Sequence, residues 1–332
     1  MEREIPQSVL QRLGIASPRP AQREAFSALS AGRDVLVVLP TGGGKSLCYQ
    51  LPAACGLSPA IVVSPLIALM KDQVDALRRR GVAAARLAGS AAPPERDRVW
   101  SQFESGELAL LYVAPEALTS RRTLARLAAV APRYLAVDEA HCISEWGESF
   151  RPAYLALGAV RRALGDPPTI ALTATATPRT RRDIARRLAL RDPVTILGGF
   201  DRPNLQLTAI QVASEDARRQ GLARALSVNA GPTVIYAPTR RETERWAGAC
   251  RRQGIAAAAY HAGLPDRERS TIQDDFLADR LSIIVATTAF GMGVDKPDVR
   301  RVLHTVPPRS LEAYYQEAGR GGRDGAPAEC LL

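Results

Sequence analysis

The sequence predicts an α/β protein of two tandem domains, each with a mostly parallel sheet flanked by helices. Short apolar runs alternate with helical stretches along the chain, which is typical of parallel sheets covered by helices. Segment 198–204 (GGFDRPN) is rich in turn-forming residues and has the composition of an interdomain linker. We therefore expect a first domain in residues 1–200 and a smaller second domain in residues 201–332, facing each other across a cleft.

The strands are expected where short apolar runs lie between turn-forming residues. In the first domain these runs are 35–39, 61–63, 108–113, 134–137 and 169–172. Helices are expected between them at 46–51, 66–79, 94–105 and 179–188. The second domain is expected to contain strands at 233–236, 256–260, 283–286 and 302–304, and helices at 241–253 and 266–278. The final residues, 328–332, resemble the beginning of another strand.

The composition favours a cytoplasmic protein with a polyanionic partner. The net charge is +10, which suits nucleic acid, although a compositional bias towards arginine is the alternative, because only three of the 44 basic residues are lysine. No apolar run approaches the roughly 18 to 20 residues of a membrane span, and the N-terminus has no signal-peptide core. The five cysteines are scattered without a Cys-x-x-Cys pair, so neither a disulfide framework nor a zinc site is predicted.

A glycine-rich loop, 39–46 (LPTGGGKS), follows the first expected strand and precedes a helix. Successive backbone N–H groups at a helix N-terminus bind phosphate, so this segment predicts a triphosphate site, with a glycine-rich turn as the alternative. The lysine supplies a compact positive charge for the β- and γ-phosphates, and the serine hydroxyl would bind Mg²⁺. The candidate nucleotide-binding residues of this loop are Thr41, Gly42, Gly43, Gly44, Lys45 and Ser46.

Two adjacent carboxylates, Asp138 and Glu139, follow the expected strand 134–137. They would lie at the carboxyl end of that strand, where α/β sheets bind ligands. Asp138 would hold Mg²⁺ through water, and Glu139 would polarise or deprotonate the attacking water. Together with the glycine loop they predict a nucleoside triphosphate hydrolase; an acidic loop that only solvates the strand end is the alternative.

Two arginines, Arg320 and Arg323, stand near the end of the second domain in segment 316–323 (QEAGRGGR). An arginine that neutralises charge on a transferring phosphate contributes about 10³ to 10⁵ in rate, so both are candidate catalytic residues. A solvated pair in an arginine-rich chain is the alternative.

Aromatic residues cluster after the paired carboxylates. Trp146, Phe150 and Tyr154 lie within nine positions, with Arg151 among them, in a chain that is only 5% aromatic. Aromatic rings stack on nucleic-acid bases at about 1–3 kcal/mol per base. The cluster therefore predicts a contact with single-stranded nucleic acid, and a packed hydrophobic corner is the alternative.

Taken in order, these segments resemble the RecQ family of superfamily-two DNA helicases over essentially the whole chain. The matching motifs are 19–22 (RPAQ), 39–52 (LPTGGGKSLCYQLP), 63–73 (VSPLIALMKDQ), 112–116 (YVAPE), 138–154, 171–177 (ALTATAT), 260–264 (YHAGL), 286–300 and 314–325. The chain departs from the family pattern at Pro18, where an aromatic residue is frequent, and at Glu148-Ser149, which replace a usual His-Asp pair.

The resemblance implies two RecA-like domains with a nucleotide cleft, ATP and Mg²⁺ as cofactors, and a DNA-stimulated ATPase. It implies 3′-to-5′ translocation on single-stranded DNA and unwinding of 3′-tailed or branched duplexes in DNA repair and recombination, by a monomer without membrane contact. Many members continue into a four-cysteine zinc module and a winged-helix domain; no zinc is expected in this chain.

The resemblance also implies roles for individual residues. Arg19 and Gln22 would read adenine, and Asp295 would contact the nucleotide from the second domain. Arg323 would be the better candidate for the arginine finger, with Arg320 beside it. The residues implied in DNA binding or its coupling to hydrolysis are Trp146, Phe150, Arg151, Thr173 and Thr175.

Two other functions remain open at this point. An RNA helicase would carry related motifs, although the aromatic-rich loop argues for DNA. A DNA-binding or strand-annealing module with ATPase activity but little unwinding is the other alternative, because of Glu148-Ser149 and the lack of further domains in the sequence.

Overall fold

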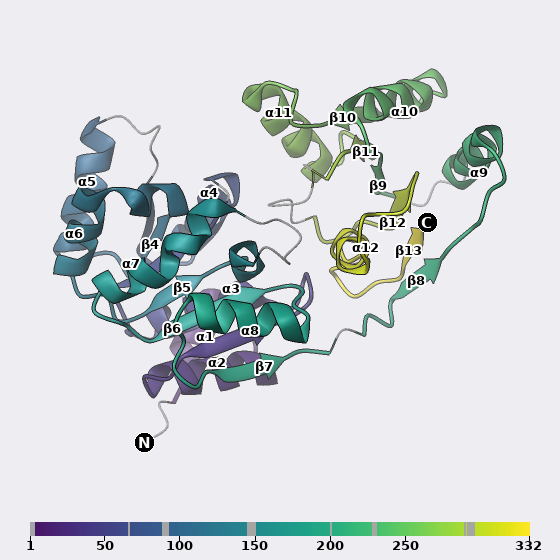
Figure 1. Ribbon diagram of the computed structural model, residues 1–332. Helices are drawn as coiled ribbons and strands as arrows, with labels where there is room; N and C mark the ends of the chain where they lie inside the picture. Colours follow the sequence, from purple (N-terminus) through teal and green to yellow (C-terminus); the bar gives the residue numbers. More distant parts are fainter. Residues whose placement is uncertain are drawn as a thin grey trace. The chain divides into compact units, whose positions relative to one another are not determined.

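The structure, a computed structural model, describes residues 4–65, 67–87, 93–144, 151–199, 201–227, 231–288, 290 and 296–332. The chain divides into two compact units, Met1–Phe200 and Asp201–Leu332. Each unit contains a sheet with helices packed against it (Figure 1). The two units are described separately below.

The first unit contains a seven-stranded sheet in the order β3-β4-β2-β5-β6-β1-β7. All the pairs of neighbouring strands are parallel. The strands are β1 (Val35–Val38), β2 (Ala60–Val63), β3 (Ala84–Leu87), β4 (Leu110–Val113), β5 (Leu135–Val137), β6 (Thr169–Thr173) and β7 (Val194–Leu197). Most of these strands are buried along their length, which explains why they read as continuous apolar runs.

Helices cover both faces of this sheet because successive strand residues point to opposite sides. Val35 and Val37 belong to one hydrophobic cluster, and Leu36 belongs to the other. The first cluster is completed by α1 (Gln7–Leu13), α2 (Pro20–Ser30), α3 (Lys45–Ala54) and α4 (Ile67–Arg79). The second is completed by α5 (Pro93–Glu104), α6 (Arg121–Ala129), α7 (Leu157–Ala163) and α8 (Pro178–Arg187), with the 3₁₀ helices η1 (Pro115–Thr119), η2 (Ala140–Ile143) and η3 (Pro152–Ala156).

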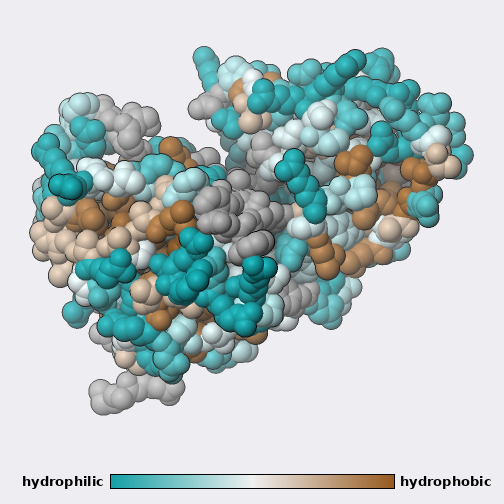
Figure 2. Space-filling model, in the orientation of Figure 1, coloured by the Kyte–Doolittle hydropathy of each residue, from teal (hydrophilic) through white to brown (hydrophobic). Residues whose placement is uncertain are grey.

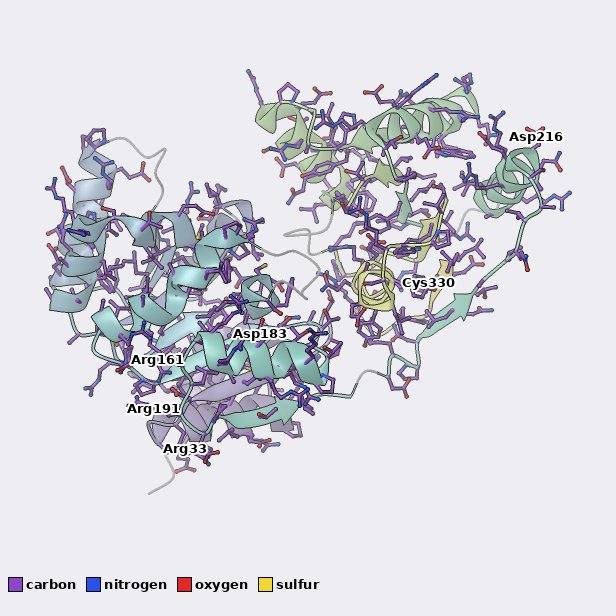
Figure 3. All side chains as sticks on the ribbon, viewed as in Figure 1. Arg33, Arg161, Asp183, Arg191, Asp216 and Cys330 are labelled. Atoms are coloured by element: carbon purple, nitrogen blue, oxygen red, sulfur yellow. The ribbon has the colours of Figure 1, made fainter. Side chains whose placement is uncertain are left out.

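A buried ion pair joins distant parts of the first unit. Asp34, immediately before β1, accepts two hydrogen bonds from Arg161 Nη2 at 2.8 and 2.7 Å. Its carboxylate also accepts the backbone N–H groups of Thr169 and Arg191, at 2.9 and 2.6 Å. Figure 3 labels Arg161 and Arg191 in this unit. The carboxylate therefore ties β1 to α7, to the start of β6 and to the segment before β7.

The second unit contains a six-stranded sheet in the order β10-β11-β9-β12-β13-β8, again with parallel pairs. Its strands are β8 (Leu205–Thr208), β9 (Thr233–Tyr236), β10 (Ala257–Tyr260), β11 (Ile283–Ala286), β12 (Arg301–His304) and β13 (Ala328–Leu331). Side chains of α11 (Asp266–Leu277) and α12 (Leu311–Ala318) pack in one hydrophobic cluster, and those of α9 (Glu215–Ser227) and α10 (Arg240–Arg252) in another.

The predicted fold class, parallel sheets flanked by helices, is confirmed. Two predicted strands, 233–236 and 283–286, have the bounds that were expected. Strands β3, β7 and β8 were not predicted. Residues 84–87 (AARL) lack β-branched side chains, and β7 and β8 are partly exposed edge strands without a continuous apolar run.

The surface and the cysteines do not identify a binding partner for the protein. In the view of Figure 2 hydrophilic residues cover much of the described surface, and hydrophobic residues form smaller separate patches. Cys48, Cys142, Cys250 and Cys330 are buried, Cys55 is partly buried, and all five are free thiols. Among the described residues, no helix combines the length and the apolar character needed to cross a membrane.

Candidate functional site

Three predicted motifs meet at one edge of the first sheet. Strands β5, β6 and β1 are neighbours and run parallel, so their carboxyl ends lie side by side. The glycine loop follows β1, Asp138 follows β5, and Thr173 ends β6. The strand order alone therefore brings the glycine loop close to Asp138 and Thr173, which follow it by more than 90 positions in the sequence.

The glycine loop has a backbone that depends on glycine. Gly44 precedes α3 with φ 76°, in the left-handed region. A Cβ atom at Gly44 would lie 2.4 Å from Gln22 Nε2, and one at Gly43 would lie 2.8 Å from the carbonyl oxygen of Pro40. The loop consequently folds tightly before the N-terminus of α3, where backbone N–H groups attract anions.

Lys45 is the first residue of α3 and is partly buried. Its Nζ donates to the carbonyl oxygens of Leu39 and Pro40, at 3.1 and 3.3 Å. The ammonium is thus held against the beginning of the loop. Its positive charge also lowers the pKa of Asp138, although other causes outweigh it there.

The two predicted adenine readers are bound to the glycine loop in this structure. Gln22 is only 4% exposed. Its Oε1 accepts the backbone N–H of Arg19 at 2.8 Å, and its Nε2 donates to the carbonyl oxygen of Gly44 at 3.1 Å. Arg19 Nη1 donates to the carbonyl oxygen of Gly42 at 3.2 Å. These two bonds use one lone pair of Oε1 and one N–H of Nε2, and they hold the amide beside the glycine loop.

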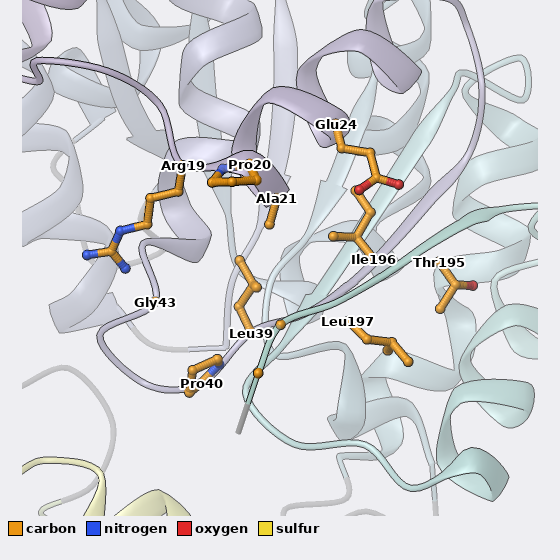
Figure 4. A pocket seen from close by; sticks show the side chains of 12 residues that line it. Arg19, Pro20, Ala21, Glu24, Leu39, Pro40, Gly43, Thr195, Ile196 and Leu197 are labelled. Carbon is orange, nitrogen blue, oxygen red and sulfur yellow. The ribbon is translucent and has the colours of Figure 1, made fainter. Parts of the chain in front are cut away.

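A pocket of about 580 Å³ lies beside the loop (Figure 4). Its walls come from the start of α2, from the glycine loop, and from β7 with the two glycines that follow it. The lining residues are Arg19, Pro20, Ala21, Glu24, Leu39, Pro40, Gly43, Thr195, Ile196, Leu197, Gly198 and Gly199. The pocket is therefore next to the predicted phosphate site and is large enough for part of a nucleotide.

Asp138 and Glu139 differ in environment. Asp138 is 7% exposed, and burial, followed by the nearby charge of Glu139, raises its pKa to about 7. Glu139 has φ 48° and ψ 46°, a left-handed conformation that is uncommon outside glycine, and its N–H donates to Asp138 Oδ1 at 3.0 Å. This backbone turns Glu139 towards His141, and such outliers are frequent at functional sites.

His141 connects the paired carboxylates to the end of β6. Its Nδ1 lies 3.3 Å from Glu139 Oε2 and 2.9 Å from Thr173 Oγ1. Burial alone would lower the pKa of His141, but Cys142 and Glu139 raise it to about 10. Thr173 Oγ1 donates to the carbonyl oxygen of Thr175 at 2.9 Å and accepts its N–H at 3.3 Å. Thr173 is fully buried and Thr175 is 8% exposed, so both side chains are largely inaccessible to solvent.

The donor set fits Mg²⁺. Over the described ranges, no group of three or more His, Cys, Asp or Glu side chains could hold a metal ion, but Mg²⁺ is usually bound by one or two protein ligands together with substrate phosphates and water. Asp138 supplies a buried carboxyl whose raised pKa reflects a poorly compensated charge, and a cation would compensate it. Ser46, in the first turn of α3, supplies a hydroxyl.

The raised pKa of Asp138 makes a testable prediction about stability. The folded protein binds the proton of Asp138 more tightly than the unfolded chain does. The stabilisation from this proton is therefore fully present below about pH 4 and is lost as the pH rises through about 7. Relative to wild type, Asp138→Asn should therefore gain about 1–3 kcal/mol in free energy of unfolding between pH 5 and pH 8. Urea unfolding at both pH values measures this gain. Asp97→Asn, an exposed change in α5, is the control, and an equal gain there would refute the assignment.

The segment after the carboxylates is anchored at its described end. Tyr154 is fully buried and its hydroxyl donates to the carbonyl oxygen of Asp138 at 2.9 Å. Arg151 Nη1 donates to the carbonyl oxygen of Pro65 at 2.8 Å. Tyr154 is consequently a packing residue, which is the alternative that the sequence left open for it. Trp146 and Phe150 lie outside the described residues, as do Glu148 and Ser149.

The second unit carries the two candidate arginines just after α12. Arg320 is 8% exposed, and Arg323 is partly exposed. Burial raises the pKa of Tyr236 to about 12, and the nearby Arg320 opposes that rise, so Arg320 lies beside Tyr236 of β9. Asp295 lies outside the described residues.

The sequence indicated several site residues without indicating their contacts. His141 is part of a matched motif, and the contacts of Tyr154 and Gln22 with backbone carbonyls depend on the fold. A buried histidine between two motifs could have been suspected from its place directly after the carboxylates, but its partner Thr173 could not.

Comparison with known proteins agrees with this arrangement. A family model described as DEAD/DEAH box helicase matches residues 19–184, and one described as helicase conserved C-terminal domain matches residues 218–325. ATP-dependent DNA helicase RecQ of Haemophilus influenzae is 44% identical over 320 residues, which are 96% of this chain and 51% of that protein. ATP-dependent DNA helicase RecQ of Synechocystis is 45% identical, over 94% of this chain and 67% of that protein.

A solved structure supports the fold. Helicase Lhr of Mycobacterium smegmatis, bound to single-stranded DNA and AMP-PNP, matches 99% of this chain and 47% of its own chain with a TM-score of 0.78 and 23% identity. The chain spans about half the length of the first of these relatives.

Proposed function

The chain belongs to the RecQ family of DNA helicases, and from that premise we propose that it is a DNA helicase driven by ATP hydrolysis that single-stranded DNA stimulates. The observation that carries the proposal is the meeting of the glycine loop, Asp138 and the His141–Thr173 contact at one sheet edge. In this proposal the edge would supply a phosphate site, a general base and a connection between them.

In the nucleotide site, Lys45 and the N–H groups of the loop would bind the β- and γ-phosphates. Ser46 and Asp138 would hold Mg²⁺, which neutralises phosphate charge when it is bound. Glu139 would accept a proton from the attacking water, and His141 would keep its carboxylate oriented. The base would occupy the pocket beside Arg19, and the remaining N–H and lone pair of the Gln22 amide would bind the adenine edge.

The second unit would contribute Arg323, with Arg320 beside it, to the phosphates when the two units close on ATP; Asp295 would add a further nucleotide contact. The greater exposure of Arg323 supports its choice as the residue that reaches the substrate. Charge developing on the transferred phosphate would then be neutralised from the side opposite Lys45.

Single-stranded DNA would contact Trp146, Phe150 and Arg151, and the Thr173–Thr175 segment would transmit that contact to His141. Repeated closing and opening would move the protein 3′ to 5′ along one strand and displace the complement. Tailed or branched duplexes, as they arise in DNA repair and recombination, would be the substrates.

The decisive experiment measures ATP turnover without nucleic acid, with single-stranded DNA and with single-stranded RNA, using Lys45→Ala as the blank. Stimulation by DNA and not by RNA is expected. A strand-displacement assay with 3′- and 5′-tailed duplexes then tests direction. Flat turnover in all three conditions contradicts the proposal and favours a binding or annealing module; stimulation by RNA alone favours an RNA helicase.

Trp146→Ala should weaken binding of single-stranded DNA, because one stacking contact is worth about 1–3 kcal/mol. Fluorescence anisotropy with a labelled oligonucleotide measures the loss, at matched ionic strength because phosphate contacts depend on salt. An unchanged affinity in a folded variant would make Trp146 a packing residue.

A further inference from the structure

A partly buried hydrogen bond between two glutamines connects the phosphate-binding helix α3 to helix α4. Gln50, one turn after Lys45 on α3, is 6% exposed. Its Nε2 donates to Gln73 Oε1 of α4 at 2.6 Å and to the hydroxyl of Tyr112 at 3.3 Å. Both donors of the amide are therefore used, and both partners belong to other elements of the first unit.

The surroundings of this pair are apolar and tightly packed. Tyr112 in β4 is 1% exposed, and its ring meets that of Tyr49 edge-on with centroids 6.3 Å apart. The hydroxyl of Tyr134 donates to the carbonyl oxygen of Tyr49, on α3. In such surroundings the buried amide of Gln50 would cost free energy without a partner, so its bonds to Gln73 and Tyr112 favour the observed packing of α3 against α4.

The chain just before α4 contacts a candidate DNA-binding residue. Pro65 lies two residues before the start of α4 at Ile67, and its carbonyl oxygen accepts a hydrogen bond from Arg151 Nη1 at 2.8 Å. Arg151 is a candidate DNA-binding residue. A displacement of α3 would thus reach Arg151 through Gln73, α4 and Pro65 without leaving the first unit.

We propose that Gln73, held by Gln50, is a positioning residue that links the nucleotide site to Arg151 through α4. This inference rests on the proposed function, because it assigns a path between the phosphate-binding helix and the DNA contact. It is separate from the His141–Thr173 contact, which joins η2 to the end of β6.

The test compares turnover with and without single-stranded DNA in Gln73→Leu, which removes the acceptor and replaces the amide by an apolar group of similar size. The ratio of stimulated to unstimulated turnover should fall about two- to thirtyfold, the range for mutations that alter coupling between sites, while turnover without DNA and the KM for ATP stay close to wild type. Gln73→Glu keeps an acceptor for Gln50 and should retain the stimulation.

A double-mutant cycle separates the link from a packing effect. Gln50→Leu together with Gln73→Leu should lower the stimulation no further than Gln73→Leu alone, because both changes break one bond. Gln102→Leu, the same substitution on α5, is the matched control and should leave the ratio unchanged. The inference is overturned if Gln73→Leu leaves the ratio unaltered or lowers turnover equally with and without DNA. It is also overturned if the losses of stimulation in the double variant are additive.

A second readout does not depend on DNA-stimulated hydrolysis. Hydrogen exchange of residues 67–79 should slow when a non-hydrolysable ATP analogue binds to wild type, and this effect should disappear in Gln73→Leu. If wild type is not stimulated by DNA, the proposed function fails while this experiment still decides the link. Nucleotide-dependent exchange that is equal in both proteins, or missing in wild type, contradicts it.

Discussion

Replacement of Lys45 by alanine is expected to lower ATP turnover by about 10²–10³-fold, the loss typical of removing one preorganised group from a charged transition state. Nζ of Lys45 already lies over the glycine loop, 3.1 and 3.3 Å from the carbonyl oxygens of Leu39 and Pro40. An arriving phosphate therefore meets a charge that needs little rearrangement. Steady-state turnover with saturating ATP and DNA measures the loss.

Lys71→Ala is the matched control, because Lys71 is the other lysine in the sequence of the first unit. Its side chain is 60% exposed and pairs with Asp75 at 3.0 Å. Stability should change little in either variant. A Lys45→Ala protein with near wild-type turnover, or a comparable loss in Lys71→Ala, would show that the glycine loop is not the hydrolytic site.

Asp34→Ala is expected to lower the free energy of unfolding of the first unit by about 3–5 kcal/mol, because it leaves a charged guanidinium buried without its partner. Arg161 is fully buried, and the bidentate bond to Asp34 is its only carboxylate contact below 3 Å among the described residues. The change also leaves the N–H groups of Thr169 and Arg191 without their acceptor. Urea unfolding of the nucleotide-free protein measures the loss.

Arg162→Ala changes an exposed residue of α7, the helix that carries Arg161, and its free energy of unfolding should stay within about 0.5 kcal/mol of wild type. Combining Asp34→Ala with Arg161→Met should destabilise less than the sum of the single changes, since the second removes the orphaned charge. Strict additivity would mean that the two side chains do not act as a pair.

The sequence predicted the glycine loop and the paired carboxylates because these motifs are local. Backbone N–H groups at the start of a helix and acidic residues at the end of a strand lie within a few positions of each other in the chain. For the same reason most of the fully buried strands were predicted. The partly exposed edge strands β7 and β8 carry no such local pattern and were missed.

By itself, then, the sequence determined the α/β class, the chemical types of the nucleotide-site residues and the family. It also predicted two domains. Only the tertiary structure decided which residues act on one another. The order β5-β6-β1 brings Asp138, Thr173 and Lys45 to one edge, and burial raises the pKa of Asp138 to about 7. The pairs Asp34–Arg161 and Gln50–Gln73 join residues 127 and 23 positions apart. The reason is physical: a motif depends on neighbours along the chain, whereas desolvation and hydrogen bonding depend on neighbours in space.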